Sequence, residues 1–340
     1  MRIAIVTDAW APQVNGVVRT LENVIAELRG GGHEVLVVSP ANAPSLPCPT
    51  YPEIRLALMT PATIGRRITA FDAQAVHIAT EGPLGIAARR WCLTRALPFT
   101  TAYHTQFPDY VAARTGADPA WIWRYVRWFH APAAAVLAST PTIERALNAH
   151  GLSRVRRWGR GVAPIFRPDG ARNATMAALE GPVLLHVGRV AVEKNIAAFL
   201  ASDVPGTKVV VGDGPARAAL ARQYPDAIFL GALFGEALAA AYRTADALVF
   251  PSRTDTFGLV MIEALACGTP VAAYPVAGPV DVLTPDTGAM HDDLRIAIAR
   301  ALTLDRGACA AAGARFTWPA SAAQFLDALE PFGGVMSRAA

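Results

Sequence analysis

The sequence predicts an α/β protein built from two domains, each with a doubly wound parallel sheet. Its 340 residues exceed the length of one ordinary domain and are enough to bury two hydrophobic cores. Short apolar runs alternate with helical patterns along the chain, which is typical of parallel strands joined by covering helices. A composition of 53% hydrophobic and 17% charged residues excludes a disordered protein.

The apolar pattern places the predicted elements in order. Between the first two predicted strands, apolar residues at helical spacing indicate a helix from Val17 to Leu28, and the three glycines at 30–32 end it. Buried strands are expected at Ile3, Val35, Val76, Phe99, Val136, Val183, Val209, Ile228, Val249 and Val271.

A stretch rich in proline, glycine and polar residues, residues 159–181, is the best candidate for the domain boundary. We place the cut at Phe166, which predicts a first domain over residues 1–166 and a second over residues 167–319. Residues 320–340 are expected to begin with a closing helix that carries Phe325, Leu326 and Leu329 on one side.

The most informative segment is residues 251–270. An apolar strand, residues 247–250, leads into a polar loop with Asp255, then into Gly258 and a helix that carries Glu263. A helix that begins at the carboxyl end of a parallel strand presents unpaired amides and a positive dipole end to an anion. The segment therefore indicates a phosphate-binding site, although the spacing of the carboxylates alone also fits an acid-capped surface helix.

A second polar loop follows the predicted strand at 183–187. It contains Gly188, Arg189 and Lys194, and Lys194 is one of only two lysines beside 29 arginines. Two fixed cations can stabilise the charge that develops on a leaving diphosphate. A solvated charged face is the alternative.

Two segments of the first half supply further candidates. Gly16 lies at a strand-to-helix turn, where it is either a plain turn glycine or a point of close approach to a ligand. His104 follows an apolar strand and is either a structural histidine or a site residue. Asp109 either orients an acceptor hydroxyl or caps the residues that follow it.

These four segments resemble the GT4 family of retaining glycosyltransferases, in which two acidic residues separated by seven others flank a short F-G-L segment. Asp255 and Glu263 have this spacing around Phe257–Leu259, and the resemblance extends over nearly the whole chain. It implies the GT-B fold, with two Rossmann-like domains facing a central cleft and a terminal helix that crosses back to the first domain.

The resemblance implies a role for each matching side chain. Arg189 and Lys194 would neutralise the donor diphosphate, and His104 would lie beside the transferred sugar. Asp255 would hold that sugar and Glu263 the ribose hydroxyls. The family usually has glutamate where this chain has Asp255, and the shorter side chain leaves the identity of the donor open. Retention of configuration would follow from attack on the face of the sugar that the leaving phosphate occupies.

Backbone groups complete the implied site. The amides at Phe257–Leu259 would cradle the diphosphate and sugar together with Gly16, and the loops 212–215 and 231–234 would shape the base pocket. The candidate nucleotide-binding residues are Gly16, Gly188, Arg189, Lys194, Gly212, Leu233, Phe257, Gly258, Leu259 and Glu263.

Charge is distributed unevenly between the halves. Residues 1–170 hold 18 arginines against 11 acidic residues, a formal charge of +7, and residues 171–340 carry −3. Residues 121–130 interleave aromatic residues with arginines, which favours docking of this segment and other arginines of the first domain at the surface of a membrane. The alternative is an aromatic helix packed on the sheet, with Trp121, Tyr125 and Trp128 inside. Without a nucleic-acid motif, nucleic-acid binding is not expected.

Several patterns bear on environment and cofactors. Scattered Cys48, Cys92, Cys267 and Cys309 indicate neither a disulfide framework nor a zinc site, and the N-terminus has no signal-peptide or membrane-spanning pattern. The pair Asp292-Asp293 is a poor match to a metal-binding DxD triplet. We expect a cytoplasmic enzyme peripherally associated with the inner face of the membrane, using a nucleotide sugar as co-substrate and no metal cofactor.

Among relatives in the family, the opening segment, residues 127–130 and residues 252–258 resemble lipid glycosyltransferases of the diacylglycerol, sulfolipid and phosphatidylinositol-mannoside type. The expected reaction transfers a hexose or hexuronic acid from a UDP-sugar or GDP-mannose to a membrane lipid such as diacylglycerol. Two alternatives stay open: a transferase with a soluble sugar or polysaccharide acceptor, and an inactive protein that only binds nucleotide sugars.

Overall fold

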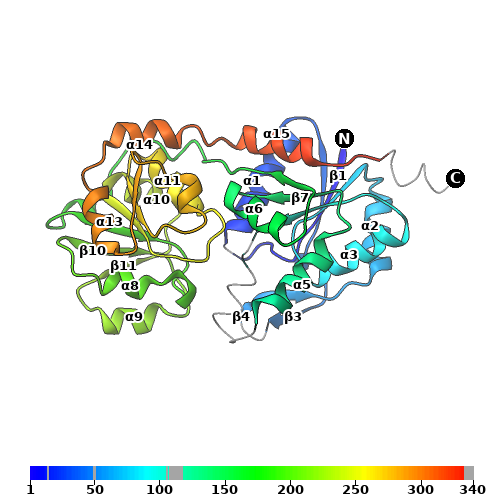
Figure 1. The fold of residues 1–340 in the computed structure, drawn as a ribbon, viewed down its shortest axis with the longest axis horizontal. Coiled ribbons are helices and arrows are strands. Elements are labelled where there is room, and N and C mark those ends of the chain that lie inside the picture. Colours follow the sequence, from blue (N-terminus) through cyan, green and yellow to red (C-terminus); the bar gives the residue numbers. More distant parts are fainter. Residues whose placement is uncertain (14, 49–50, 105, 107–117, 333–340) are drawn as a thin grey trace. The chain divides into compact units, whose positions relative to one another are not determined.

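The computed structural model describes residues 1–13, 15–48, 51–104, 106 and 118–332. The chain divides into two compact units: the first contains Met1–Gly159 and the segment from Trp318 onward, and the second contains Arg160–Thr317 (Figure 1). The sequence placed the boundary at Phe166, whereas this division places it between Gly159 and Arg160. Phe166 is 6% exposed and its ring lies 5.8 Å from that of Tyr242 in the core of the second unit.

The first unit contains a six-stranded parallel sheet in the order β2-β1-β5-β6-β7-β8. Helices α1 and α15 pack against each other, as do α2 and α3. The strands are β1 (Arg2–Val6), β2 (Glu34–Val38), β5 (Ala75–Ile78), β6 (Thr100–Tyr103), β7 (Ala135–Ala138) and β8 (Val155–Arg157), with an antiparallel pair β3 (Ser45–Cys48) and β4 (Tyr51–Ala57). The helices are α1 (Gly16–Gly30), α2 (Pro61–Ala70), α3 (Pro83–Thr94), α5 (Pro119–His130), α6 (Pro141–Ala149) and α15 (Trp318–Ala328), with a short 3-10 turn η1 (Pro40–Asn42).

The second unit contains another six-stranded parallel sheet, in the order β11-β10-β9-β12-β13-β14. Its strands are β9 (Val183–Val187), β10 (Thr207–Val211), β11 (Ile228–Gly231), β12 (Ala247–Phe250), β13 (Val271–Ala273) and β14 (Gly288–Met290). The helices are α7 (Ala174–Ala177), α8 (Ile196–Leu200), α9 (Arg217–Gln223), α10 (Gly235–Thr244), α11 (Leu259–Ala266), α12 (Pro279–Val282), α13 (Leu294–Ala301) and α14 (Arg306–Gly313), with a 3-10 turn η2 (Val192–Lys194).

Both faces of the second sheet are buried, as expected for a doubly wound sheet. Along β9, Leu185 lies in one hydrophobic cluster with residues of α10 and α11, whereas the preceding Leu184 lies in another with residues of α8 and α13. Successive side chains of a strand point to opposite faces, so the continuous apolar run reflects a core on each side. The predicted pair of doubly wound parallel-sheet domains is confirmed.

Helix α1 illustrates how local sequence forms an element. The side chain of Asn15 accepts hydrogen bonds from the amides of Val17 and Val18 at the N-terminus, and the buried face repeats at helical spacing through Leu21 and Leu28. The helix gives way to Gly31, whose amide bonds back to Glu27. The predicted helix is confirmed.

Strand order creates one switch point in each sheet. In the first sheet β1 lies between β2 and β5, and in the second β9 lies between β10 and β12. The chain therefore continues from β1 to one side of the first sheet and from β5 to the other, and likewise from β9 and β12 in the second sheet. The loops that follow the two neighbouring strands consequently lead away from each other. Ligands of open α/β sheets bind in the resulting crevice at the carboxyl ends of the strands.

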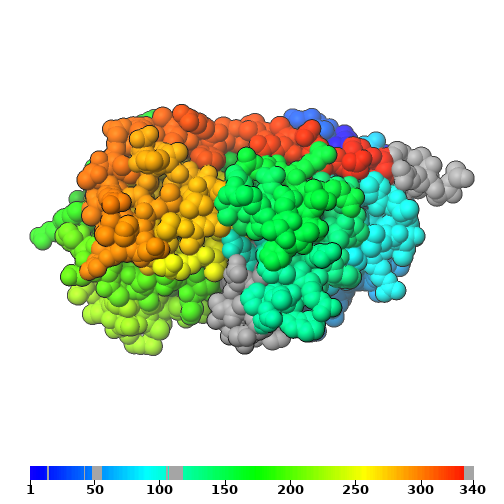
Figure 2. Space-filling view, viewed as in Figure 1, coloured from blue at the N-terminus to red at the C-terminus, as the bar shows by residue number. Residues whose placement is uncertain are grey.

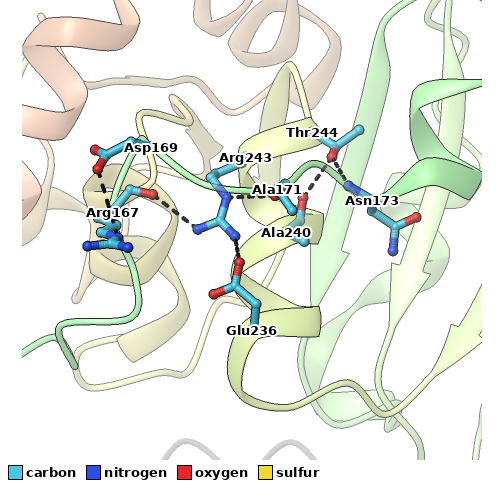
Figure 3. Close-up of polar contacts among 8 residues, drawn as sticks. All are labelled: Arg167, Asp169, Ala171, Asn173, Glu236, Ala240, Arg243 and Thr244. Atoms are coloured by element: carbon cyan, nitrogen blue, oxygen red, sulfur yellow. Dashed lines mark hydrogen bonds and ion pairs between the residues drawn. The ribbon is translucent and has the colours of Figure 1, made fainter.

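The segment that follows the first unit is held against α10 rather than forming a loose linker (Figure 3). Arg243 of α10 donates to the carbonyl of Ala171 at 2.8 Å and to that of Arg167 at 3.3 Å, and its guanidinium pairs with Glu236. Thr244 accepts a hydrogen bond from the amide of Asn173 at 2.7 Å. These contacts explain why this proline-rich segment belongs to the second unit.

Replacing Arg243 is expected to destabilise the second unit. The side chain is 4% exposed, so Arg243→Met leaves two carbonyls and the Glu236 carboxylate without their donor. We expect a loss of about 2–3 kcal/mol in the free energy of unfolding, measured by urea denaturation. As a control, Arg295→Met removes an exposed ion pair with Asp293 and should leave the urea midpoint unchanged. Equal effects of the two substitutions would contradict this assignment.

Candidate active site

The switch point of the second sheet brings two of the predicted site residues together. Lys194 ends the turn after β9 and Asp255 lies in the loop after β12, and the two strands are neighbours. The Lys194 ammonium contacts both carboxylate oxygens of Asp255, at 2.6 and 2.9 Å. The side-chain amide of Asn195 donates to the carbonyl of Pro251 at 3.2 Å and links the same two loops.

Asp255 is ionised within this pair. Burial favours the neutral acid, but the adjacent Lys194 ammonium outweighs that effect and holds the pKa of Asp255 below its usual range. Arg189, which follows the same strand as Lys194, forms an ion pair with Glu193 at 3.3 Å. The side chains of Arg189 and Lys194 are 28% and 25% exposed, although Nε and Nη2 of Arg189 are themselves buried.

Two glycines make the backbone of this edge possible. Gly258 precedes α11 at φ +86°, in the left-handed region, and a Cβ there would lie 2.8 Å from Met261 Cε. Gly212 has φ +138°, and a Cβ there would lie 1.8 Å from the carbonyl oxygen of Gly188. Glycine is therefore needed at position 212, where the ends of β9 and β10 approach each other.

Other predicted nucleotide-binding residues are partly structural. Phe257 is 7% exposed and its ring packs edge-on against Phe316, with 6.1 Å between centroids. Leu233 is half-buried against the hydrophobic core. The backbone amides of Phe257 and Leu259, rather than their side chains, are therefore the candidates for binding a diphosphate.

Glu263 lies inside the second unit. It is 3% exposed, and its Oε2 accepts a hydrogen bond from the Tyr242 hydroxyl at 3.0 Å. Tyr242 comes from α10 and is itself fully buried, so it orients the carboxylate. Sequence analysis missed Tyr242, because an aromatic residue on a helix facing the core carries no signal of such a contact.

A buried histidine also lies beside the Lys194–Asp255 pair. His186 is 2% exposed, its Nδ1 is 3.2 Å from the carbonyl oxygen of Val249, and burial lowers its pKa to about 4. The ring is therefore neutral at pH 7 and donates from Nδ1.

The buried state of His186 predicts loss of stability on acidification. Its pKa is depressed in the folded protein, so the unfolded chain binds more protons below its ordinary pKa of 6.5. The stabilisation is complete above that pH and is lost as the pH falls toward 4, by about 2 kcal/mol between pH 7 and pH 5. Urea denaturation of the protein and of His186→Gln at both pH values measures this difference. An identical pH dependence in the variant would contradict it.

The first unit places its candidates at the carboxyl edge of its own sheet. Gly16 is the first residue of α1 and is exposed, and two amides that follow it already bond to the side chain of Asn15. His104 follows β6, half-buried, with its ring edge-on to that of Trp158 at 5.5 Å between centroids. Asp109 lies outside the described residues.

A polar network at the switch point of the first unit escaped sequence analysis. Asp8, after β1, accepts hydrogen bonds from the Thr80 hydroxyl and from the Leu84 amide, both at 2.9 Å. Burial nevertheless raises the pKa of Asp8. His130 Nε2 lies 3.2 Å from a carboxylate oxygen of the buried Glu81. Asp8 and Glu81 follow the neighbouring strands β1 and β5, and this placement is the signal that could have revealed them.

Helix α5 of the first unit, which contributes to the surface seen in Figure 2, exposes three of its aromatic side chains. Trp121, Tyr125 and Trp128 are 66%, 38% and 47% exposed, and the same helix buries Val126 and Phe129. The alternative that buried the three aromatic side chains against the sheet is therefore wrong.

Two arginines pack over the exposed tryptophan rings. Arg89 of α3 lies over the Trp128 ring at 4.1 Å and donates to the carbonyls of Trp128 and Phe129. Arg124 lies over the Trp121 ring at 4.8 Å. Exposed Ile86 and Leu93 on α3 extend the apolar surface. We call the outward side chains of α3 and α5, Ile86, Arg89, Leu93, Trp121, Arg124, Tyr125 and Trp128, the aromatic-basic face.

Within the part of the chain that the structure describes, no helix has both the length and the apolar character to cross a bilayer. The same residues contain no group of three or more His, Cys, Asp or Glu side chains placed to hold a metal ion. Cys92, Cys267 and Cys309 are buried free thiols.

Comparison with known proteins agrees with this architecture. The Glycosyltransferase Family 4 model matches residues 14–164, and the Glycosyl transferases group 1 model matches residues 181–303. The chain is 34% identical over 311 residues to a GDP-mannose-dependent alpha-mannosyltransferase of Mycobacterium tuberculosis, a match that covers 84% of this chain and 82% of that protein. It is 29% identical over 304 residues to sulfoquinovosyl transferase SQD2 of Arabidopsis thaliana, covering 80% of this chain and 59% of that one.

A solved structure shows the fold at lower identity. Sucrose-phosphate synthase from Thermosynechococcus elongatus aligns with a TM-score of 0.75 at 22% identity, over 96% of this chain and 97% of that one. The likeness confirms the predicted GT-B class of two parallel-sheet domains.

Proposed function

Because the chain belongs to glycosyltransferase family 4, we propose that it transfers a sugar from a nucleotide diphosphate donor to a membrane lipid, with retention of configuration. The transferred group is a hexose or hexuronic acid, and the acceptor is a lipid such as diacylglycerol. The observation that carries the lipid acceptor is the aromatic-basic face, because exposed tryptophan beside arginine suits the headgroup region of a membrane.

The donor half of the proposal rests on the edge of the second sheet. Arg189 and Lys194 lie in one loop at the switch point, and α11 begins in the neighbouring loop. We assign the two cations to the diphosphate, whose charge grows as the glycosidic bond breaks, and the amides at Phe257–Leu259 to the same group. This assignment needs no metal cofactor, because the side-chain cations supply the positive charge.

The remaining donor contacts follow the family roles. Asp255 would hold the transferred sugar and Glu263, oriented by Tyr242, the ribose hydroxyls. GDP-mannose is the first donor to test, since the mycobacterial relative at 34% identity is named for it. A UDP-sugar is the second, and UDP-sulfoquinovose is included because a relative is named for sulfoquinovosyl transfer.

In the first unit, we assign His104 to the transferred sugar and Gly16 to the approach of the diphosphate. The aromatic-basic face would then dock on the membrane and bring the lipid acceptor close to the donor. The proposal places the protein in the cytoplasm, peripherally bound to the inner face of the membrane. Its support is the cluster of arginine and tryptophan on one face of the first unit.

A donor and acceptor panel tests this function. GDP-mannose, UDP-glucose, UDP-galactose, UDP-glucuronate and UDP-sulfoquinovose are each incubated with diacylglycerol, ceramide or phosphatidylinositol in mixed micelles, and products are identified by mass spectrometry. A new glycolipid is the expected result and identifies both substrates. Donor hydrolysis without a glycolipid would retain the transferase and contradict the lipid acceptor, as would transfer to a soluble sugar. Binding of donors without any turnover would support an inactive nucleotide-sugar-binding protein instead.

A further inference from the structure

Each of the two cations proposed to bind the diphosphate already has a carboxylate partner. Lys194 contacts both oxygens of Asp255, and Arg189 pairs with Glu193 at 3.3 Å. All four side chains are between 14% and 28% exposed. The proposed diphosphate site therefore contains two positive and two negative charges when it is empty.

This pairing limits what each cation can offer a ligand. An ammonium has three N–H donors, and the two short contacts of Lys194 direct it toward both oxygens of Asp255. With two of its three donors directed at Asp255, Lys194 can give a diphosphate more than one hydrogen bond only by giving up a contact with the carboxylate. The net gain is smaller than for an unpaired cation, and the nearby carboxylates repel the bound anion.

Glu193 lies in the same short loop as both cations. Glu193 precedes Lys194 in the same 3-10 turn and lies four residues after Arg189, so one short loop holds both cations and one counter-ion. Asp255 supplies the second counter-ion from the loop after β12. Both pairs lie wholly within the second unit, so the arrangement does not depend on the first unit.

We propose that Glu193 and Asp255 act as resident counter-ions that keep Arg189 and Lys194 in position and weaken the binding of the nucleoside diphosphate product. This inference rests on the proposed function, because it assumes that a nucleoside diphosphate binds these cations. Glu193 is a positioning residue that no family role assigned, and Asp255 gains a second role beside its contact with the sugar.

The arrangement has a use in turnover. The same cations that stabilise the leaving diphosphate would otherwise hold the product tightly and slow its release. A carboxylate that returns to each cation as the product departs lowers that barrier. It also avoids leaving two partly buried cations unpaired in the empty enzyme.

Binding of GDP and UDP by isothermal titration calorimetry tests the inference directly. Neither probe carries the transferred sugar, so the proposed contact of Asp255 with that sugar does not enter the measurement. Glu193→Gln and Asp255→Asn are each expected to bind the preferred nucleoside diphosphate about threefold to tenfold more tightly than the native protein, because a partly exposed ion pair is removed. Product inhibition of sugar transfer should become stronger by the same factor.

Two control variants separate this effect from a general change of charge. Asp293→Asn removes one negative charge from the same unit, but Asp293 pairs with Arg295 rather than with Arg189 or Lys194. It should leave the affinity within about twofold of the native value, since Asp293 has its own ion-pair partner and interactions of surface charges are screened at physiological salt. Glu193→Asp keeps the negative charge and should retain most of the native affinity.

Three results would overturn the inference. The first is unchanged or weaker binding in both Glu193→Gln and Asp255→Asn, which would leave the proposed donor site standing. The second is equally tighter binding in Asp293→Asn, which would indicate bulk charge alone. The third is absence of GDP and UDP binding by the native protein, which would remove the proposed function and this inference together.

Discussion

Lys194→Ala is expected to lower kcat by about 100-fold or more, which corresponds to about 3 kcal/mol of transition-state stabilisation. The reason is that negative charge grows on the diphosphate as the glycosidic bond breaks, and the ammonium interacts with that charge most strongly in the transition state. Steady-state kinetics with the donor and acceptor from the panel would separate kcat from KM. A rise in KM with unchanged kcat would contradict this role, because it indicates equal binding of substrate and transition state.

The chain supplies a matched control for this substitution. Lys208 is its only other lysine, and its ammonium donates to the carbonyls of Leu200 at 2.8 Å and Ser202 at 2.5 Å, between β10 and α8. Lys208→Ala should keep the native kcat in protein that remains folded. Thermal unfolding of both variants would show whether the loss of activity in Lys194→Ala occurs in folded protein.

The double substitution Trp121→Ser and Trp128→Ser is expected to weaken binding to anionic phospholipid vesicles by about 100-fold, or about tenfold for each tryptophan. Both rings are about half exposed or more, so their removal deprives the membrane-bound state of apolar burial without opening a cavity in the core. Co-sedimentation with vesicles of phosphatidylglycerol and phosphatidylcholine measures the change. Unchanged vesicle binding would contradict docking through the aromatic-basic face.

A control from the other unit tests whether any exposed apolar side chain has this effect. Ile296 is 37% exposed on α13, and Ile296→Ser should leave vesicle binding unchanged. Hydrolysis of the donor in the absence of lipid should be unaffected by the tryptophan substitutions. Equal loss of lipid glycosylation and of donor hydrolysis would indicate a structural role for the tryptophans.

The sequence by itself determined the class of fold and the positions of most elements. Apolar runs of a doubly buried sheet are a local property, so β1, β9 and β12 were found at the predicted residues, as was α1. The edge strands β8 and β14 were missed because each is only three residues long. Each also has a single large apolar side chain, Val155 in β8 and Met290 in β14. The antiparallel pair β3 and β4 was missed as well.

Candidate loops could be predicted for the same local reason. Gly188, Lys194, Asp255 and Gly258 each follow an apolar strand, and the carboxyl ends of parallel strands share one edge of a sheet. The contacts between side chains of different loops could not be predicted. The Lys194–Asp255 contact requires β9 and β12 to be neighbours, although the strands β10 and β11 separate them in the sequence.

Only the tertiary structure decided the remaining contacts and surfaces. The alternation of aromatic residues and arginines in α5 was compatible with either face of the helix turning inward, and packing on the sheet selected Val126 and Phe129 for burial and left Trp121 exposed. Tyr242 reaches Glu263 because α10 and α11 pack side by side. Periodicity can be read from consecutive residues. The partner that a side chain contacts depends instead on which distant elements share a core, and for this reason the contacts of the site could be identified only from the tertiary structure.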